Sequence, residues 1–117
     1  MGFGMGTFPD PAIFLLSQRA GLAQLLCAQL YNVPVAELQA PSRGRPRAAR
    51  ARQIAIHLLR QVFRLSDHDL AIAFRRDPST VRHACQLVAR LRKGDDELDA
   101  TLRWMESHLR RATRFKP

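Results

Sequence analysis

Residues 74–84 carry the side-chain types that contact a DNA duplex. Their pattern predicts a helix that begins near Pro78, with short polar side chains at its start. At the tip of a helix, an Asp can accept a hydrogen bond from cytosine N4, and a Ser or Thr can contact a thymine methyl group or a base edge in the major groove. The candidate base-reading residues are Asp77, Ser79, Thr80, Arg82 and His83.

Two alternatives stay open for these side chains. Asp77 is well placed to cap the helix, a role that is compatible with base contact. Ser79 and Thr80 can equally bind a phosphate, because the N-terminus of a helix is positive.

Arginines around this segment are candidates for contacts to the DNA backbone. Arg75 and Arg76 lie in the turn before the helix, and a turn that is merely solvated is the alternative. Arg50 and Arg52 stand at the start of a long predicted helix and are expected to bind phosphate. A loop rich in Arg, Gly and Pro can place one guanidinium in a minor groove, or can simply be solvated, and its arginines are Arg43, Arg45 and Arg47.

The positive charge is concentrated around the same segment. The formal net charge is +9 and the sequence pI is about 11.4. Residues 43–92 hold twelve Arg and three Asp, whereas residues 1–42 have a net charge of −1 and residues 93–117 a net charge of +1. Charge alone does not distinguish DNA, RNA and anionic membrane, but its concentration at one motif favours a nucleic acid.

Other classes of function find no support in the sequence. There is no P-loop, no Gly-rich dinucleotide motif and no Ser/His/Asp order, so we expect no enzyme, no cofactor and no small-molecule substrate. We expect Cys27 and Cys85 to be free thiols, although a disulfide is the alternative. No apolar run is long enough for a signal sequence or a membrane span, which predicts a cytoplasmic protein at the nucleoid. The histidines show no metal-binding spacing, and they are His57, His68, His83 and His108.

Two helices joined by a short turn are predicted to position the candidate residues. Ser66 is a capping residue with Asp69 three positions later, and residues 66–73 read as a short helix. We expect Ile72 or Ala73 to point inward from it. Asp77 and Pro78 start the second helix, which runs to about residue 93 with Gly94 after its end. This arrangement predicts a helix-turn-helix.

The remaining chain is also predicted to be helical. We expect one or two helices from about residue 11 to 32, with Gly21 as a break or bend, then a helical turn at 35–38, a helix at 47–64 and a last helix from about 95 to 111. No alternating β pattern occurs, so the predicted fold is all-α with five or six helices in one domain, residues 12–112, between flexible tails at 1–11 and 113–117. The first helix has more apolar positions than one face needs, and the candidates for a protein interface there are Ile13, Phe14, Leu15 and Leu16.

Three blocks of the sequence resemble a known family. Residues 30–38 (LYNVPVAEL), 49–56 (ARARQIAI) and 76–84 (RDPSTVRHA) are similar, in this order, to segments of the C-terminal DNA-binding domain of the bacterial replication initiator DnaA. The resemblance covers about residues 22–110. It implies a helical bundle related to the Trp repressor that binds short asymmetric DNA boxes.

The resemblance also assigns roles to single residues. It implies that Asp77, Ser79 and Thr80 contact bases or phosphate, that Arg43 or Arg45 enters a minor groove, and that Arg52, Gln53 and Arg76 lie on the DNA side. Two departures stand out. Pro78 replaces the base-reading His of the family, and the family's Gly-Gly-Arg-Asp turn is shortened to residues 75–77.

Three hypotheses follow for the function. The first is a sequence-preferring DNA-binding protein that modulates replication initiation, or transcription, without ATPase activity. The second is an adaptor that binds the initiator, another replication protein or itself through the N-terminal helix. The third is a nucleoid protein that binds DNA without sequence preference.

Overall fold

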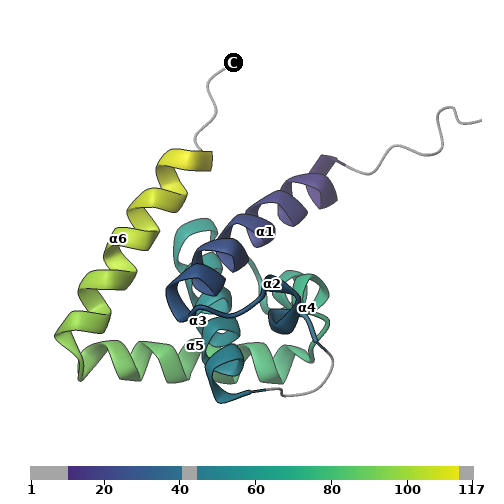
Figure 1. Ribbon diagram of the computed structural model, residues 1–117. Coiled ribbons are helices and arrows are strands. Elements are labelled where there is room, and N and C mark those ends of the chain that lie inside the picture. The colour runs from purple at the N-terminus through teal and green to yellow at the C-terminus, as the bar shows by residue number, and fades with distance from the viewer. Residues whose placement is uncertain (1–10, 41–44, 114–117) are drawn as a thin grey trace, which may run out of the picture.

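Helices alone build the part of the chain that the structure describes. The computed structural model describes residues 11–40 and 45–113, without the side chain of Ile13, and these residues form six helices and no strand (Figure 1). The all-α prediction is confirmed. The helices are α1 (Pro11–Tyr31), α2 (Val35–Leu38), α3 (Pro46–Phe63), α4 (Asp67–Phe74), α5 (Pro78–Lys93) and α6 (Asp96–Thr113).

Helix α3 forms the centre of the core. It packs against α1, α2, α5 and α6, and α4 packs against α1 and α5. Alanines on α3 let neighbouring helices approach closely, while its branched side chains fill the space between them. The residues of α3 with at most 1% of their surface exposed are Ala48, Ala51, Ile54, Ala55, Ile56, His57, Leu58 and Leu59.

Local signals set most helix boundaries. The side chain of Ser66 accepts a hydrogen bond from the backbone N–H of Asp69 at 3.0 Å, so the predicted cap of α4 is confirmed. Pro46 and Pro78 open α3 and α5, where a missing N–H costs nothing. Left-handed residues end α1 at Asn32 and α3 at Arg64, with φ of 52° and 57°.

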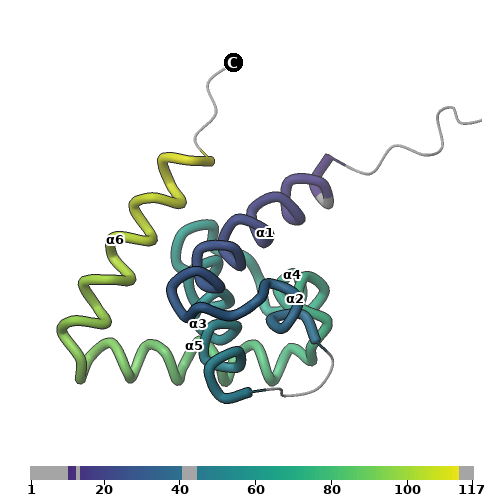
Figure 2. Tube along the Cα trace, in the orientation of Figure 1, coloured from purple at the N-terminus to yellow at the C-terminus, as the bar shows by residue number. Residues whose placement is uncertain are grey.

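Three expectations about these elements have different outcomes. The expected break at Gly21 is wrong, because α1 continues from Pro11 to Tyr31 as one helix (Figure 2). Gly94 follows the end of α5 as predicted, with φ of −102°. Of the two alternatives on α4, Ile72 is 59% exposed, whereas Ala73 is partly buried against the core. The buried side chains of α4 are those of Leu70, Ala71 and Phe74.

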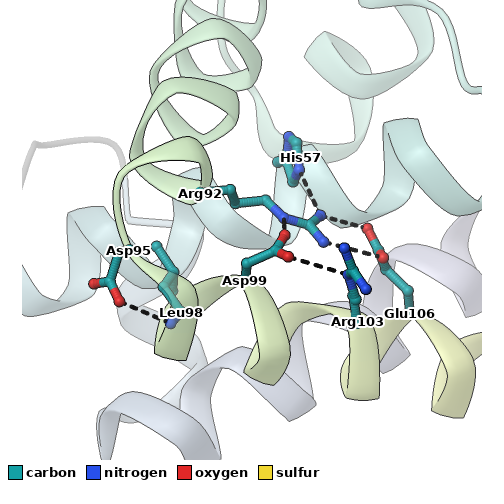
Figure 3. A network of polar contacts seen from close by, with 7 residues as sticks. All are labelled: His57, Arg92, Asp95, Leu98, Asp99, Arg103 and Glu106. Atoms are coloured by element: carbon teal, nitrogen blue, oxygen red, sulfur yellow. Dashed lines mark hydrogen bonds and ion pairs between the residues drawn. The ribbon is translucent and has the colours of Figure 1, made fainter.

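A polar network fastens α6 to the rest of the domain (Figure 3). The guanidinium of Arg92 on α5 donates to Asp99 Oδ1 and Glu106 Oε2 on α6, both at 2.7 Å. One Nη of Arg92 also lies 3.2 Å from Nε2 of His57 on α3. Burial, and then the charge of Arg92, lower the pKa of His57, so the neutral imidazole can accept this hydrogen bond. The network joins three helices at the end of α5 away from its tip.

Candidate nucleic-acid interface

The turn between α4 and α5 is held by backbone hydrogen bonds. The N–H of Arg76 donates to the carbonyl of Ala71 at 3.0 Å, and the N–H of Arg75 donates to that of Ile72 at 3.3 Å. Arg75 takes a left-handed conformation with φ of 56°. The buried residues Phe74 and Val81 lie on either side of this turn. The predicted helix-turn-helix is confirmed.

The tip of α5 is open to solvent. Every residue from Asp77 to Thr80 is exposed, as are Arg82 and His83. Asp77 stands at the N-cap position, but its side chain accepts no capping hydrogen bond from the first turn of α5, all of whose residues are described. The cap that was predicted as an alternative role for Asp77 is therefore not formed by its carboxylate. That carboxylate stays available for a ligand.

The α5 tip stands between two hollows of the surface. One has a volume of about 680 Å³ and lies between the first half of α3 and α5. The other, of about 520 Å³, lies on the α4 side of the turn. Arg76 and Thr80 line both hollows. The other residues of the larger hollow are Ala49, Arg52, Gln53, Ile56, Ser79, His83 and Ala84.

Arg52, which the sequence suggested as a phosphate-binding residue, is largely buried. It is 6% exposed, and its guanidinium donates to the carbonyl oxygens of Leu38 at 2.7 Å and Glu37 at 3.1 Å. These carbonyls are at the C-terminal end of α2, where a cation is favourable. Burial, and then the charge of Arg76, lower the pKa of Arg52. Its position in the structure is that of a tie between α2 and α3.

Arg76 also makes an internal tie. Its Nη2 donates to the carbonyl of Ala40 at 2.7 Å, and its Nη1 lies 3.3 Å from the carbonyl oxygen of Phe74. The side chain is half-buried and connects the turn to the segment that follows α2. A guanidinium has further N–H groups, so Arg76 still presents part of its charge to both hollows.

The other arginines that were predicted to contact the DNA backbone differ in their exposure and in their hydrogen bonds within the domain. Arg47 and Arg75 are exposed, and Arg50 donates to Gln53 Oε1 at 3.2 Å. Arg45 is exposed and forms an ion pair with Glu37 at 2.7 Å. Arg43 lies outside the described residues, so the structure does not bear on the choice between Arg43 and Arg45.

Asp67 of α4 links α3 to α5, which the sequence did not indicate. Its carboxylate pairs with Arg60 of α3 and, at 3.2 Å, with Arg82 of α5. The hydrogen bond from Arg60 is the main reason that the pKa of Asp67 is lowered. Arg82 is thus partly engaged, although its side chain is 57% exposed.

Ile72 is a second residue of this surface that the sequence did not identify. It lines the smaller hollow beside Arg75 and Thr80, with more than half of its surface exposed. The sequence offered one indication of this exposure, since either Ile72 or Ala73 could occupy the inward position of α4.

The predicted interface residues on α1 lie away from the α5 tip. Phe14 is 52% exposed and Leu15 43% exposed, while Leu16 is half-buried. The side chain of Ile13 lies outside the described residues. Helix α1 packs against α2, α3, α4 and α6.

The described residues contain no helix that is long and apolar enough to cross a membrane. In the same part of the chain, no three His, Cys, Asp or Glu residues are grouped as metal ligands would be. Cys27 and Cys85 are both free.

Comparison with known proteins shows which family this chain resembles. Residues 23–88 match the family model described as the bacterial dnaA protein helix-turn-helix. The chromosomal replication initiator protein DnaA of Acinetobacter baumannii (strain AYE) is 39% identical over 77 residues, which are 65% of this chain and 16% of the initiator. The same protein of Aromatoleum aromaticum is 38% identical over 77 residues, with the same coverage. The chain thus spans about a sixth of the length of these relatives. The family model covers α4, the turn and most of α5, and we conclude that the chain belongs to the bacterial DnaA helix-turn-helix family.

Proposed function

We propose that this chain binds double-stranded DNA with a sequence preference and modulates the initiation of chromosome replication, or transcription, at its binding sites. The observation that carries the proposal is the exposed polar tip of α5, which stands between two hollows inside the basic part of the chain. The sequence contains no P-loop, so the proposal assigns it no ATP-driven step.

The polar side chains at the surface of this region, which are exposed except for the half-buried Arg50, divide into two groups by their chemistry. Asp77, Ser79, Thr80 and His83 carry acceptors and donors suited to base edges or to the nearest phosphates. Arg47, Arg50 and Arg75 carry charges that the described residues do not neutralise, which suits phosphate contacts. The buried guanidinium of Arg52 belongs to neither group, because two carbonyls already occupy it.

Because of Pro78, the proposed DNA sequence preference of this chain differs from that of its relatives. It is exposed at the first position of α5, and its pyrrolidine ring offers apolar contact without a hydrogen-bond donor. A DNA sequence bound by the α5 tip therefore receives no hydrogen bond from the side chain at position 78. We expect its preferred sequence to overlap with initiator boxes only in part.

The proposal is tested by fluorescence anisotropy with an initiator-box duplex, a duplex obtained by selection and a shuffled duplex, over a range of salt concentrations. Arg50→Ala should weaken binding to all three and lower the salt slope by about one. Thr80→Ala should mainly reduce the difference between selected and shuffled duplexes. Arg111→Ala is the matched control, because Arg111 is exposed on α6, and it should leave the affinity and the salt slope nearly unchanged.

Two results would contradict the proposal. Equal affinity of the wild type for selected and shuffled duplexes would favour a sequence-neutral nucleoid binder. Absence of DNA binding at low salt would favour the adaptor hypothesis.

A further inference from the structure

A cluster of three charged side chains joins α3, α4 and α5 beside the helix-turn-helix. Asp67, the first residue of α4, accepts a hydrogen bond from Arg60 of α3 with its Oδ1. Its other oxygen, Oδ2, accepts a hydrogen bond from Nε of Arg82 on α5 at 3.2 Å. The side chains of Arg60 and Asp67 are 34% and 28% exposed, whereas that of Arg82 is 57% exposed. Asp67 is therefore fixed from the side of the domain, and Arg82 is the outer member of the cluster.

The hydrogen bond from Nε leaves the other end of the Arg82 guanidinium open. No described residue accepts a hydrogen bond from its two Nη groups, which carry four of the five N–H donors of a guanidinium. These donors lie in one plane and are fixed relative to one another. Guanine presents two acceptors, O6 and N7, on its major-groove edge, and an Arg that donates to both is the commonest specific contact to DNA. The open end of Arg82 has the chemistry that this contact requires.

Arg82 lies one turn behind the tip of α5. It follows Ser79 by three residues and directly precedes His83, and both of these line the larger hollow. Side chains three positions apart are neighbours on the surface of a helix. The pairing with Asp67 places Arg82 on the flank of α5 that faces the start of α4. A base pair contacted by Arg82 would therefore be next to those that the tip reaches.

Asp67 affects which DNA groups can approach Arg82. The hydrogen bond from Arg60 is the main reason that the pKa of Asp67 is lowered, so its carboxylate is ionised at neutral pH. A phosphate that approached Arg82 would come close to this carboxylate, and the two negative charges would repel. Guanine O6 and N7 carry no net charge and do not meet this repulsion. An Arg that is paired in this way favours a base edge over a phosphate.

We propose that Arg82 reads a guanine in the major groove and that Asp67 is its positioning residue. This role of the pair rests on the proposed function, because it requires that the chain binds DNA through α5. It adds the base that is read and the two side chains that select it. An exposed ion pair contributes little to the stability of a fold, so the effect of this pair should be seen in DNA binding rather than in folding.

Fluorescence anisotropy with the selected duplex tests the guanine contact. In a series of duplexes, one guanine at a time is replaced by 7-deazaguanine, which lacks the N7 acceptor and keeps its Watson–Crick pairing. At one position the replacement should weaken binding by the wild type about fivefold, because one of the two hydrogen bonds from Arg82 is lost. The same replacement should leave binding by Arg82→Ala unchanged. On the unmodified duplex, Arg82→Ala should bind about tenfold more weakly than the wild type.

Asp67→Asn tests the positioning role. The variant keeps an oxygen that can accept from Arg60, so the domain should stay folded, which circular dichroism checks. It loses the charge that holds Arg82 and repels phosphate. The effect of 7-deazaguanine should shrink by about two- to fivefold, the range for exposed ion pairs. The salt slope should rise by about one, because Arg82 can then bind a phosphate.

Asp69→Asn is the matched control for the change of charge. Asp69 is in the first turn of the same helix, and its carboxylate forms no ion pair with the described residues. Its replacement removes the same charge two positions from Asp67, so general electrostatic attraction should increase in the same way. The response to 7-deazaguanine should stay that of the wild type.

The possible failures of the guanine contact and of the proposed function differ. If the wild type prefers the selected duplex but responds to no 7-deazaguanine that Arg82→Ala ignores, the guanine contact is overturned and the proposed function stands. If Asp67→Asn responds to 7-deazaguanine as the wild type does, or Asp69→Asn responds as weakly as Asp67→Asn, Asp67 does not position Arg82. Equal affinity of the wild type for selected and shuffled duplexes would overturn both proposals.

Discussion

Replacement of Arg75 separates the stability of the turn from its contact with DNA. Arg75 has φ of 56°, and its side chain is exposed. A left-handed conformation costs a residue with a Cβ about 1–2 kcal/mol. The greater freedom of Gly in the unfolded chain offsets about 0.5–1 kcal/mol of the gain from removing that Cβ. Arg75→Gly should therefore raise the free energy of unfolding by about 0.5–1 kcal/mol relative to Arg75→Ala, which keeps the strain.

Both Arg75 variants lose the same charge, so they should lose DNA affinity equally. Urea denaturation measures the stability of each variant, and anisotropy with a duplex over a salt series measures affinity. Each variant should lower the salt slope by about 0.9, the value for one phosphate contact. Arg64→Gly is the matched control, because Arg64 has φ of 57° at the far end of α3. It should gain stability and keep its affinity. Equal stability of Arg75→Gly and Arg75→Ala would show that the left-handed conformation of Arg75 costs no stability, and wild-type affinity in either variant would show that Arg75 does not contact DNA.

Two further predictions concern residues that hold the domain together. Arg52→Ala should lower the free energy of unfolding by about 2–4 kcal/mol in urea denaturation, because two carbonyls lose their donor. The salt slope of DNA binding by the folded variant should stay unchanged. A slope that is reduced by one, with little loss of stability, would instead indicate that Arg52 binds a phosphate. Glu106→Ala should lower the free energy of unfolding by about 2–3 kcal/mol, because the largely buried Arg92 loses one of its two carboxylate partners and keeps only Asp99. Stability equal to that of the wild type would show that the ion pair between Arg92 and Glu106 does not hold α6 in place.

The arginines of this domain serve two purposes, which the net charge alone does not reveal. Arg52, Arg76 and Arg92 donate to acceptors inside the domain and connect separate segments of the chain. Arg47, in the first turn of α3, and Arg75, in the turn before α5, are exposed. Only the second group adds its full charge to the surface that faces a ligand. The salt dependence of binding should therefore be smaller than the twelve arginines of residues 43–92 would suggest.

Local sequence signals predicted the helix-turn-helix well. Ser66 and Pro78 mark helix starts whose physics lies within a single turn, so no tertiary information is needed. The partners of Arg52 and Arg76 could not be predicted in this way. Their acceptors are 14, 15 and 36 residues distant along the chain, and only packing brings them together.

The exposure of individual apolar residues was also beyond the sequence pattern. Ile72 and Ala73 are neighbours in a short helix, and either satisfied the apolar spacing of α4. The packing of α4 against α1 and α5 leaves Ile72 outside. Helix α1 is apolar on both sides, so its periodicity does not indicate which side is buried.

An NMR titration of the labelled chain with a duplex shows whether the tip of α5 binds DNA. The largest changes in backbone amide shifts should fall on residues 75–83, with smaller ones at the start of α3, while α1 and α6 should change little. Largest changes on α1 or α6, or none at the α5 tip under saturating duplex, would contradict DNA binding by this tip.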